Sequence, residues 1–287
     1  MRMHGFIIFV LVSLGVSLSF AGDDNNRATK DDGRWLFLDS ADIPTLKHNL
    51  SHEAIFKKYV DGYNLTVLKA IDIVQAHAMD GGGYFTGIKA KPTESPIGYE
   101  VKIFDKSLLS PPRTTSYCSG STYGVLIETL NLIFPDGGSK ISPDRYESLR
   151  MQEPDGSRRE DQIKFWGKWN DDGWGTQYAL VQYSGMGEEV TPERARPGDF
   201  ANIAWTSGVG HSVVFLGWYK KNDQLGMVFW SSQKSTNGFG DVAMSPLSRV
   251  KSVKFVRLTR PERVFTFDVQ QQVNRDLPGD KVDAPVP

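Results

Sequence analysis

The order of hydrophobic patterns along the chain constrains its fold more than any single motif. Apolar residues recur at helical spacing from Ile43 to Ala78 and again after Cys118, whereas alternating β-rich segments dominate after residue 198. Helices followed by strands, instead of alternating with them, are typical of α+β proteins. We therefore expect an α+β fold in which N-terminal helices, including the one that starts at Cys118, pack on an antiparallel β-sheet.

The strands of this sheet are marked by turn signals. A Pro-Gly-Asp turn at Pro197–Asp199 precedes the first strand, a glycine-containing turn at 207–210 precedes the second, and a polar hairpin tip at 220–226 follows it. Two earlier segments, Tyr84–Ile88 and Tyr99–Phe104, also alternate and predict strands. The expected strands of the main sheet are Phe200–Trp205, His211–Trp218, Met227–Ser232, Val250–Leu258 and Val264–Val269.

The N-terminus has the pattern of a secretory signal. A short polar start precedes the apolar core Gly5–Leu18, and the small residues Ser19 and Ala21 occupy the positions that a signal peptidase reads. The apolar core is short for a membrane span, which favours cleavage over an uncleaved anchor. We expect residues 1–21 to be a signal peptide, and the mature protein to be extracytoplasmic, either periplasmic or secreted.

The remaining chain predicts one domain with flexible ends. A polar linker is expected at 22–34 and a catalytic domain at 35–270, with an insertion at about 135–175 that is rich in Asp, Gly and Pro. A disordered tail is expected at 271–287. The formal net charge of -1 argues against nucleic acid as a partner.

The only cysteine, Cys118, lies where a polar loop turns into an apolar helix. Ser116, Ser119 or Ser121 could cap that helix, and the exposed N–H groups and dipole of a helix N-terminus stabilise a thiolate. The alternative is a buried structural cysteine. A single cysteine in a secreted chain cannot form an internal disulfide, which favours pairing with a partner or a reactive thiol.

A cysteine nucleophile needs a base, and His211 is the strongest candidate. It opens a strand directly after a glycine-containing turn, although a histidine there could equally have no role. If this strand pairs with the next one about the tip at 222–223, His211 lies opposite residues 232–235. Gln233 is the polar residue there best suited to orient the imidazole. Because a slip of one residue reverses the face, Ser231, Ser235 and Asn237 are alternatives.

Three short motifs together resemble NlpC-like cell-wall peptidases. Cys118–Gly120 resembles their Cys-Ser-Gly, Arg196–Phe200 resembles their Pro-Gly-Asp strand opening, and Gly210–Gly217 is similar to their Gly-His-apolar strand and to that of CHAP-type amidases. The motifs occur in the family's order. Tyr117 precedes the cysteine where the family usually has Asp.

The resemblance implies a papain-like (NlpC-type) core with N-terminal helices. It also implies that Cys118 is the nucleophile, His211 the base and a polar residue, here Gln233, the third member. The implied function is a secreted cysteine hydrolase, a thiol peptidase or amidase that cleaves peptide amides of peptidoglycan. No cofactor, metal, nucleic acid or membrane span after signal cleavage is expected.

Two alternatives remain open. The chain could be a catalytically silent papain-like module that binds glycan or peptide, or an acyl-transferase that uses the same thioester. The presence of both Cys118 and His211 favours hydrolysis over a silent module. Hydrolysis and transfer share every residue considered above.

Overall fold

A computed structural model describes residues 35–86, 96–111, 113–151, 165–166 and 175–273 of the 287-residue chain. The predicted signal peptide, the linker at 22–34, nearly all of the predicted tail and much of the predicted insertion lie outside these residues. Within the described part, no helix is long and apolar enough to cross a membrane.

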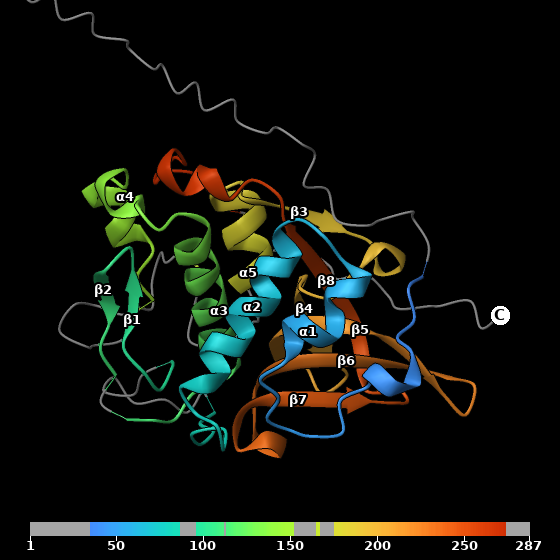
Figure 1. The fold of residues 1–287 in the computed structure, drawn as a ribbon. Helices are drawn as coiled ribbons and strands as arrows, with labels where there is room; N and C mark the ends of the chain where they lie inside the picture. The colour runs from blue at the N-terminus through green and yellow to red at the C-terminus, as the bar shows by residue number, and fades with distance from the viewer. Residues whose placement is uncertain (1–34, 87–95, 112, 152–164, 167–174, 274–287) are drawn as a thin grey trace, which may run out of the picture.

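The centre of the fold is an antiparallel sheet of six strands in the order β3-β8-β4-β5-β6-β7 (Figure 1). Every neighbouring pair in this sheet is antiparallel. A separate two-stranded sheet is formed by β1 and β2. The strands are β1 (Val101–Ile103), β2 (Lys106–Leu109), β3 (Gly187–Val190), β4 (Phe200–Trp205), β5 (Gly210–Lys221), β6 (Gln224–Gln233), β7 (Gly238–Met244) and β8 (Val250–Leu258).

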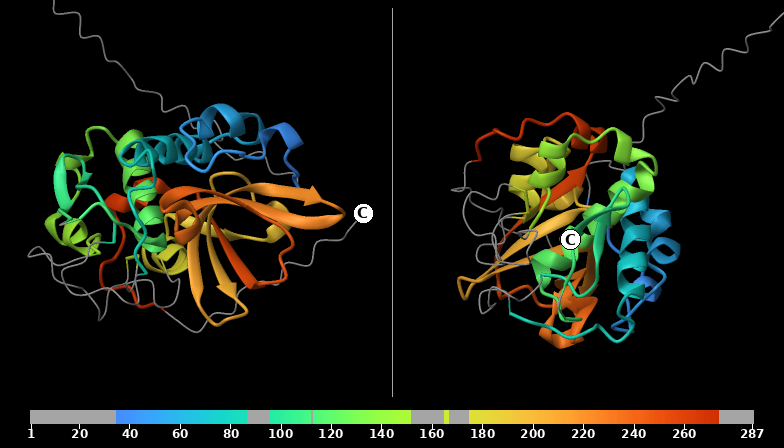
Figure 2. Two further views of the ribbon diagram at one scale, coloured as in Figure 1. Left: turned by 90° about the horizontal axis from the view of Figure 1, so that it is seen from below. Right: turned by 90° about the vertical axis from the view of Figure 1, so that its left-hand side faces the viewer.

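The helices lie along one side of the twisted sheet, as the two views of Figure 2 show. The longest, α3, packs against α2 and against strands β5 and β6. A π-helical turn at Tyr178–Tyr183 continues α5. The helices are α1 (His52–Phe56), α2 (Tyr63–Ala76), α3 (Cys118–Ile133), α4 (Pro143–Ser148) and α5 (Gly175–Gln177).

Alternation along the strands divides the core into two clusters. Val214, Leu216 and Trp230 face the helices and belong to the main core, whereas Val213 and Phe215 belong to a second cluster on the other side of the sheet. Both sides of β5 are therefore buried, which explains why its sequence is a nearly continuous apolar run. The combination of helices with an antiparallel sheet confirms the coarse expectation, and the papain-like core stays a prediction.

Several sequence-based expectations were wrong in detail. The segment predicted as strand Val264–Val269 begins as a 3-10 helix, Pro261–Phe265, because proline at the first position presets a helical φ. The helical spacing that starts at Ile43 gives no helix before His52, and Ser40–Asp42 forms only one 3-10 turn. Tyr84 forms a single bridge to Ser116, and residues 87–88 of that predicted strand lie outside the described part.

Candidate thiol site

Cys118 is the first residue of α3. Tyr117 is the N-cap residue and makes no side-chain cap, so the prediction that Ser116, Ser119 or Ser121 caps the helix was wrong. The backbone N–H of Tyr117 instead donates to the Pro96 carbonyl at 3.2 Å. Only 1% of Cys118 is exposed, so the thiol is buried as well as placed at a helix N-terminus.

The start of α3 is fastened to the sheet by hydroxyl groups. Ser121 Oγ donates to the Cys118 carbonyl at 2.7 Å and accepts the backbone N–H of Ser232 at 3.1 Å. Thr122 Oγ1 lies 2.8 Å from Ser212 Oγ. Because Ser121 and Thr122 follow Cys118 by one helical turn, these contacts bring the face of α3 that carries the cysteine to the ends of β5 and β6.

His211 is the second residue of β5 and neighbours Ser212. Side chains alternate along a strand, so the imidazole leaves β5 on the side opposite to Ser212 and α3. There it stacks on Trp205, with ring centroids 6.1 Å apart, and meets Phe229 edge-on at 5.7 Å. The structure thus brings Cys118 and His211 to the same end of the sheet, with His211 directed towards the second cluster.

The aromatic surroundings control the charge of His211. The residue is 8% exposed, and this burial lowers the pKa of its imidazole from 6.5 to about 4, against the opposing effect of Gln233. At neutral pH the ring is therefore uncharged and has a nitrogen lone pair available to accept a proton.

Gln233, the last residue of β6, lies beside this imidazole. The β5–β6 register pairs Val214 with Trp230, and its continuation brings His211 level with Gln233. Gln233 Nε2 donates to Thr236 Oγ1 at 2.5 Å and to the Gly240 carbonyl at 3.1 Å. Gln233 also interacts through its side chain with the His211 imidazole and favours the protonated ring, and its Oε1 is a buried atom that forms no hydrogen bond among the described residues.

Among the described residues, no hydrogen bond joins His211 to the other candidates for the third position. Ser231 Oγ donates to the Ser212 carbonyl at 2.6 Å. The carbonyl of Ser235 accepts from Lys47 Nζ at 2.8 Å. Asn237 has a left-handed backbone with φ of 54° and lines a separate cavity.

Tyr84 is a neighbour of Cys118 that the sequence did not single out. Burial, with a contribution from the negative field of Cys118, raises the pKa of its phenol. Tyr84 and Phe85 pack against Tyr117, directly before the cysteine. The sequence analysis also did not identify Trp205 and Phe229 as neighbours of His211. Trp205 lies just before the turn that leads to His211, and this position was a signal for the contact between the two rings.

Asp199 has a structural role, in agreement with the interpretation of Pro197–Asp199 as a turn. Its carboxylate is fully buried and receives Nε and Nη2 of Arg257 at 2.9 and 2.8 Å. It also accepts the Asn64 amide at 2.9 Å and the backbone N–H of Arg196 at 2.8 Å. These bonds join α2, the turn and β8, so a change at Asp199 would affect folding first.

A cavity of about 350 Å³ lies beside the loop that leads to Cys118. The rings of His77 and Tyr99 stack at 3.9 Å on one wall, and Asp80 and Thr114 add polar groups. Among the described residues, no group of three or more His, Cys, Asp or Glu side chains is placed to hold a metal ion.

Comparisons with known proteins found no matching family model, no matching curated protein and no matching solved structure. The assignment of function therefore depends on the chain's own residues and their geometry.

Proposed function

We propose that this protein is a cysteine hydrolase that cleaves amide bonds of cell-wall peptides through Cys118 and His211. The observation that carries the proposal is the docking of the cysteine-bearing N-terminus of α3 on the strand end that holds a neutral, buried histidine. The short motifs that resemble NlpC-like and CHAP-type enzymes, and the papain-like core that they imply, give the substrate class.

In this mechanism the neutral imidazole of His211 accepts the proton of the Cys118 thiol. The thiolate attacks the amide carbonyl and forms a C–S bond, and the oxyanion is bound by backbone N–H groups at the start of α3. As the C–N bond breaks, the imidazolium returns its proton to the leaving amine. Water then hydrolyses the thioester and regenerates the thiol.

Gln233 keeps the imidazole in one orientation during this cycle. Its Nε2 is held by Thr236 and Gly240, and its side-chain interaction with the ring favours the protonated form that follows thiol deprotonation. The mechanism also requires movement at the site, because the thiol is buried and the imidazole leaves β5 on the side away from α3.

That burial is the observation that favours a second candidate function. A papain-like module that binds glycan or peptide without cleaving it needs no accessible thiol, and the cavity beside the Cys118 loop would serve such binding. An acyl-transferase would use the same thioester but pass the acyl group to an amine. We propose an extracytoplasmic location for any of these functions, because residues 1–21 have the signal pattern.

The test is the release of new amino groups from purified peptidoglycan by wild-type protein and by Cys118→Ser. Serine keeps the size of the side chain but is a far weaker nucleophile, so we expect activity to fall by at least about a thousandfold with a thermal melt close to that of wild type. Ser148→Ala, which removes a half-buried hydroxyl of α4 that donates to the Arg145 carbonyl, is the control and should retain full activity.

The products separate the candidates. Hydrolysis yields one free carboxyl for each new amine, whereas transfer yields a new amide when an acceptor amine is added. Full activity in folded Cys118→Ser would exclude a cysteine mechanism. Binding of peptidoglycan without any cleavage by wild type would support the silent module.

A further inference from the structure

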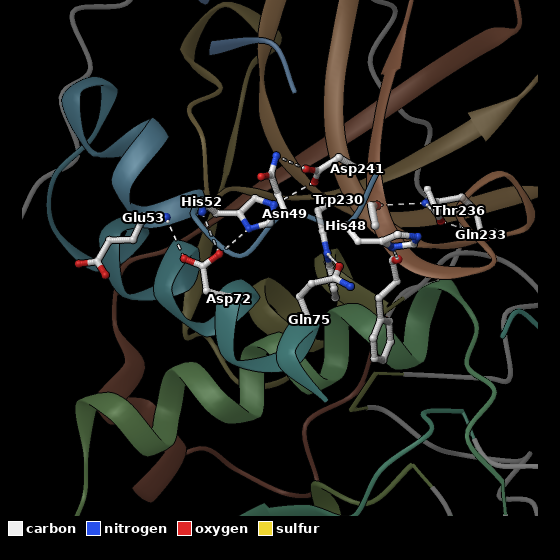
Figure 3. Close-up of polar contacts among 12 residues, drawn as sticks. His48, Asn49, His52, Glu53, Asp72, Gln75, Trp230, Gln233, Thr236 and Asp241 are labelled. Atoms are coloured by element: carbon white, nitrogen blue, oxygen red, sulfur yellow. Dashed lines mark hydrogen bonds and ion pairs between the residues drawn. The ribbon is translucent and has the colours of Figure 1, made fainter. Parts of the chain in front are cut away.

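His52 lies between two carboxylates in the interior of the protein (Figure 3). Its Nδ1 is 2.6 Å from Asp72 Oδ1, and its Nε2 is 2.9 Å from Asp241 Oδ1. The residue is fully buried, and its ring lies 6.3 Å from that of Phe56. The three polar residues come from α1, α2 and β7, so one imidazole joins two N-terminal helices to a strand that is distant in sequence.

The two carboxylates keep this histidine charged. Burial alone would lower the pKa of His52, but Asp241 and then Asp72 outweigh it and raise the value to about 9. Both ring nitrogens therefore donate at neutral pH. Charged or titratable residues close to it in sequence include Glu53 on α1, which is exposed, and His48 and Lys47 in the segment before α1.

The segment 47–51 lies along β7, the last strand of the sheet order. The Lys47 carbonyl accepts the backbone N–H of Asp241 at 2.7 Å, and His48 Nδ1 is 2.9 Å from the Phe239 carbonyl. Asn49 Nδ2 donates to Asp241 Oδ2 at 3.3 Å. The segment therefore covers part of an edge that would otherwise present open backbone groups.

Gly240 connects this cluster to the candidate site. It precedes Asp241, and a Cβ atom on it would lie 2.5 Å from the Lys47 carbonyl and 2.9 Å from Thr236 Cβ. Its own carbonyl accepts Gln233 Nε2, as does Thr236 Oγ1. The position of Gly240 thus depends on the contacts of Asp241 and in turn determines where the Gln233 amide points.

We propose that Asp241 and His52 are positioning residues for His211, and that they act through Gly240 and Gln233. The hydrogen bond between His52 and Asp241 holds β7 in position. In this position the Gly240 carbonyl accepts from the Gln233 amide and fixes its orientation. The Gln233 side chain that is held in this way interacts with the imidazole of His211. The inferred role in catalysis rests on the proposed hydrolase function, whereas the inferred coupling between His52 and His211 does not.

The test compares Asp241→Asn and His52→Gln with Asp39→Asn, which removes an exposed carboxylate paired with Lys58. We expect the first two variants to change the ring ¹⁵N signals of His211 and to lower kcat about tenfold with little change in KM. The loss is in kcat because the orientation of a base matters in the transition state. Asp39→Asn should leave the His211 signals and kcat unchanged.

A titration of wild type gives the same information if a variant does not fold. His52 loses its proton near pH 9, so the ring signals of His211 should move with the midpoint at which the His52 signals move. Unchanged His211 signals in the titration, or in a folded Asp241→Asn protein, would overturn the proposal. If wild type cleaves no wall peptide but the His211 signals follow His52, the hydrolase function fails and the coupling between the sites stands.

Discussion

At the scale of single residues, the environment of His211 sets the pH range in which the proposed base can act. Trp205 and Phe229 exclude water from the ring, and Gln233 opposes their effect without reversing it. With a pKa of about 4, the imidazole is uncharged throughout the neutral pH range, but it is also a weaker base than an ordinary histidine. Proton transfer from the thiol is then favourable only if the resulting ion pair is stabilised, for which the start of α3 and Gln233 are the available groups.

Trp205→Ala should raise the pKa of His211 by about one unit, because removal of the stacked ring admits water to the imidazole. NMR titration of the histidine ring signals measures this directly, and the acid limb of kcat/KM should move to higher pH by the same amount. Trp35→Ala, a change in the second cluster that contacts Trp218 instead, is the control. An unchanged His211 midpoint in folded Trp205→Ala would show that this ring does not cause the shift.

At the scale of secondary-structure elements, the N-terminus of α3 is positioned by close packing. A Cβ atom on Gly120 would lie 1.7 Å from the Pro96 carbonyl oxygen, a backbone atom that cannot move alone. A Cβ on Gly124 would instead meet the side-chain ends of Ile97 and Tyr99, at 2.5 and 2.8 Å. Two glycines one turn apart in one helix therefore offer a matched comparison.

Gly120→Ala should destabilise the protein by about 2–4 kcal/mol, since strain exceeds the gain of about 1 kcal/mol that alanine brings to a helix interior. Gly124→Ala should cost clearly less, because flexible side-chain ends can shift. Urea unfolding of both variants measures the difference. Equal stability of the two would contradict the close approach of Pro96 to α3, and with it the packing that positions Cys118.

The elements that sequence patterns predicted are those with strong apolar alternation. Strands β4, β5, β6 and β8 were found near their expected bounds. The register at the hairpin tip would continue to residue 234 opposite His211, and the bulge between Phe215 and Gly217, which the sequence did not indicate, shifts it to Gln233. Strand β7 was missed because Gly238 and Gly240 break the pattern, and β3 because Glu188 and Glu189 do. The burial of Cys118 and its N-cap depend on contacts between distant segments, which no local pattern encodes.

At the scale of the whole molecule, two buried histidines make folding stability depend on pH in opposite directions. His211 has a folded-state pKa of about 4, below its ordinary 6.5, so its contribution is complete above pH 6.5 and is lost as the pH falls towards 4. His52 has a folded-state pKa of about 9, so its contribution is complete below pH 6.5 and is lost as the pH rises through 9. Stability should therefore be greatest near pH 6.5.

Each histidine should account for roughly 3 kcal/mol across its own range, because the folded-state pKa values of about 4 and about 9 both lie far from the ordinary 6.5. Urea unfolding at pH 5, 6.5 and 9 tests this in wild type, His211→Gln and His52→Gln. His211→Gln should flatten the acid side alone, because glutamine takes up no proton in the unfolded chain. His52→Gln should lower stability at pH 6.5 and flatten the alkaline side, since the two carboxylates lose their cation at every pH. An alkaline slope that survives in His52→Gln would mean that His52 is not the group whose deprotonation weakens the contacts of α1, α2 and β7.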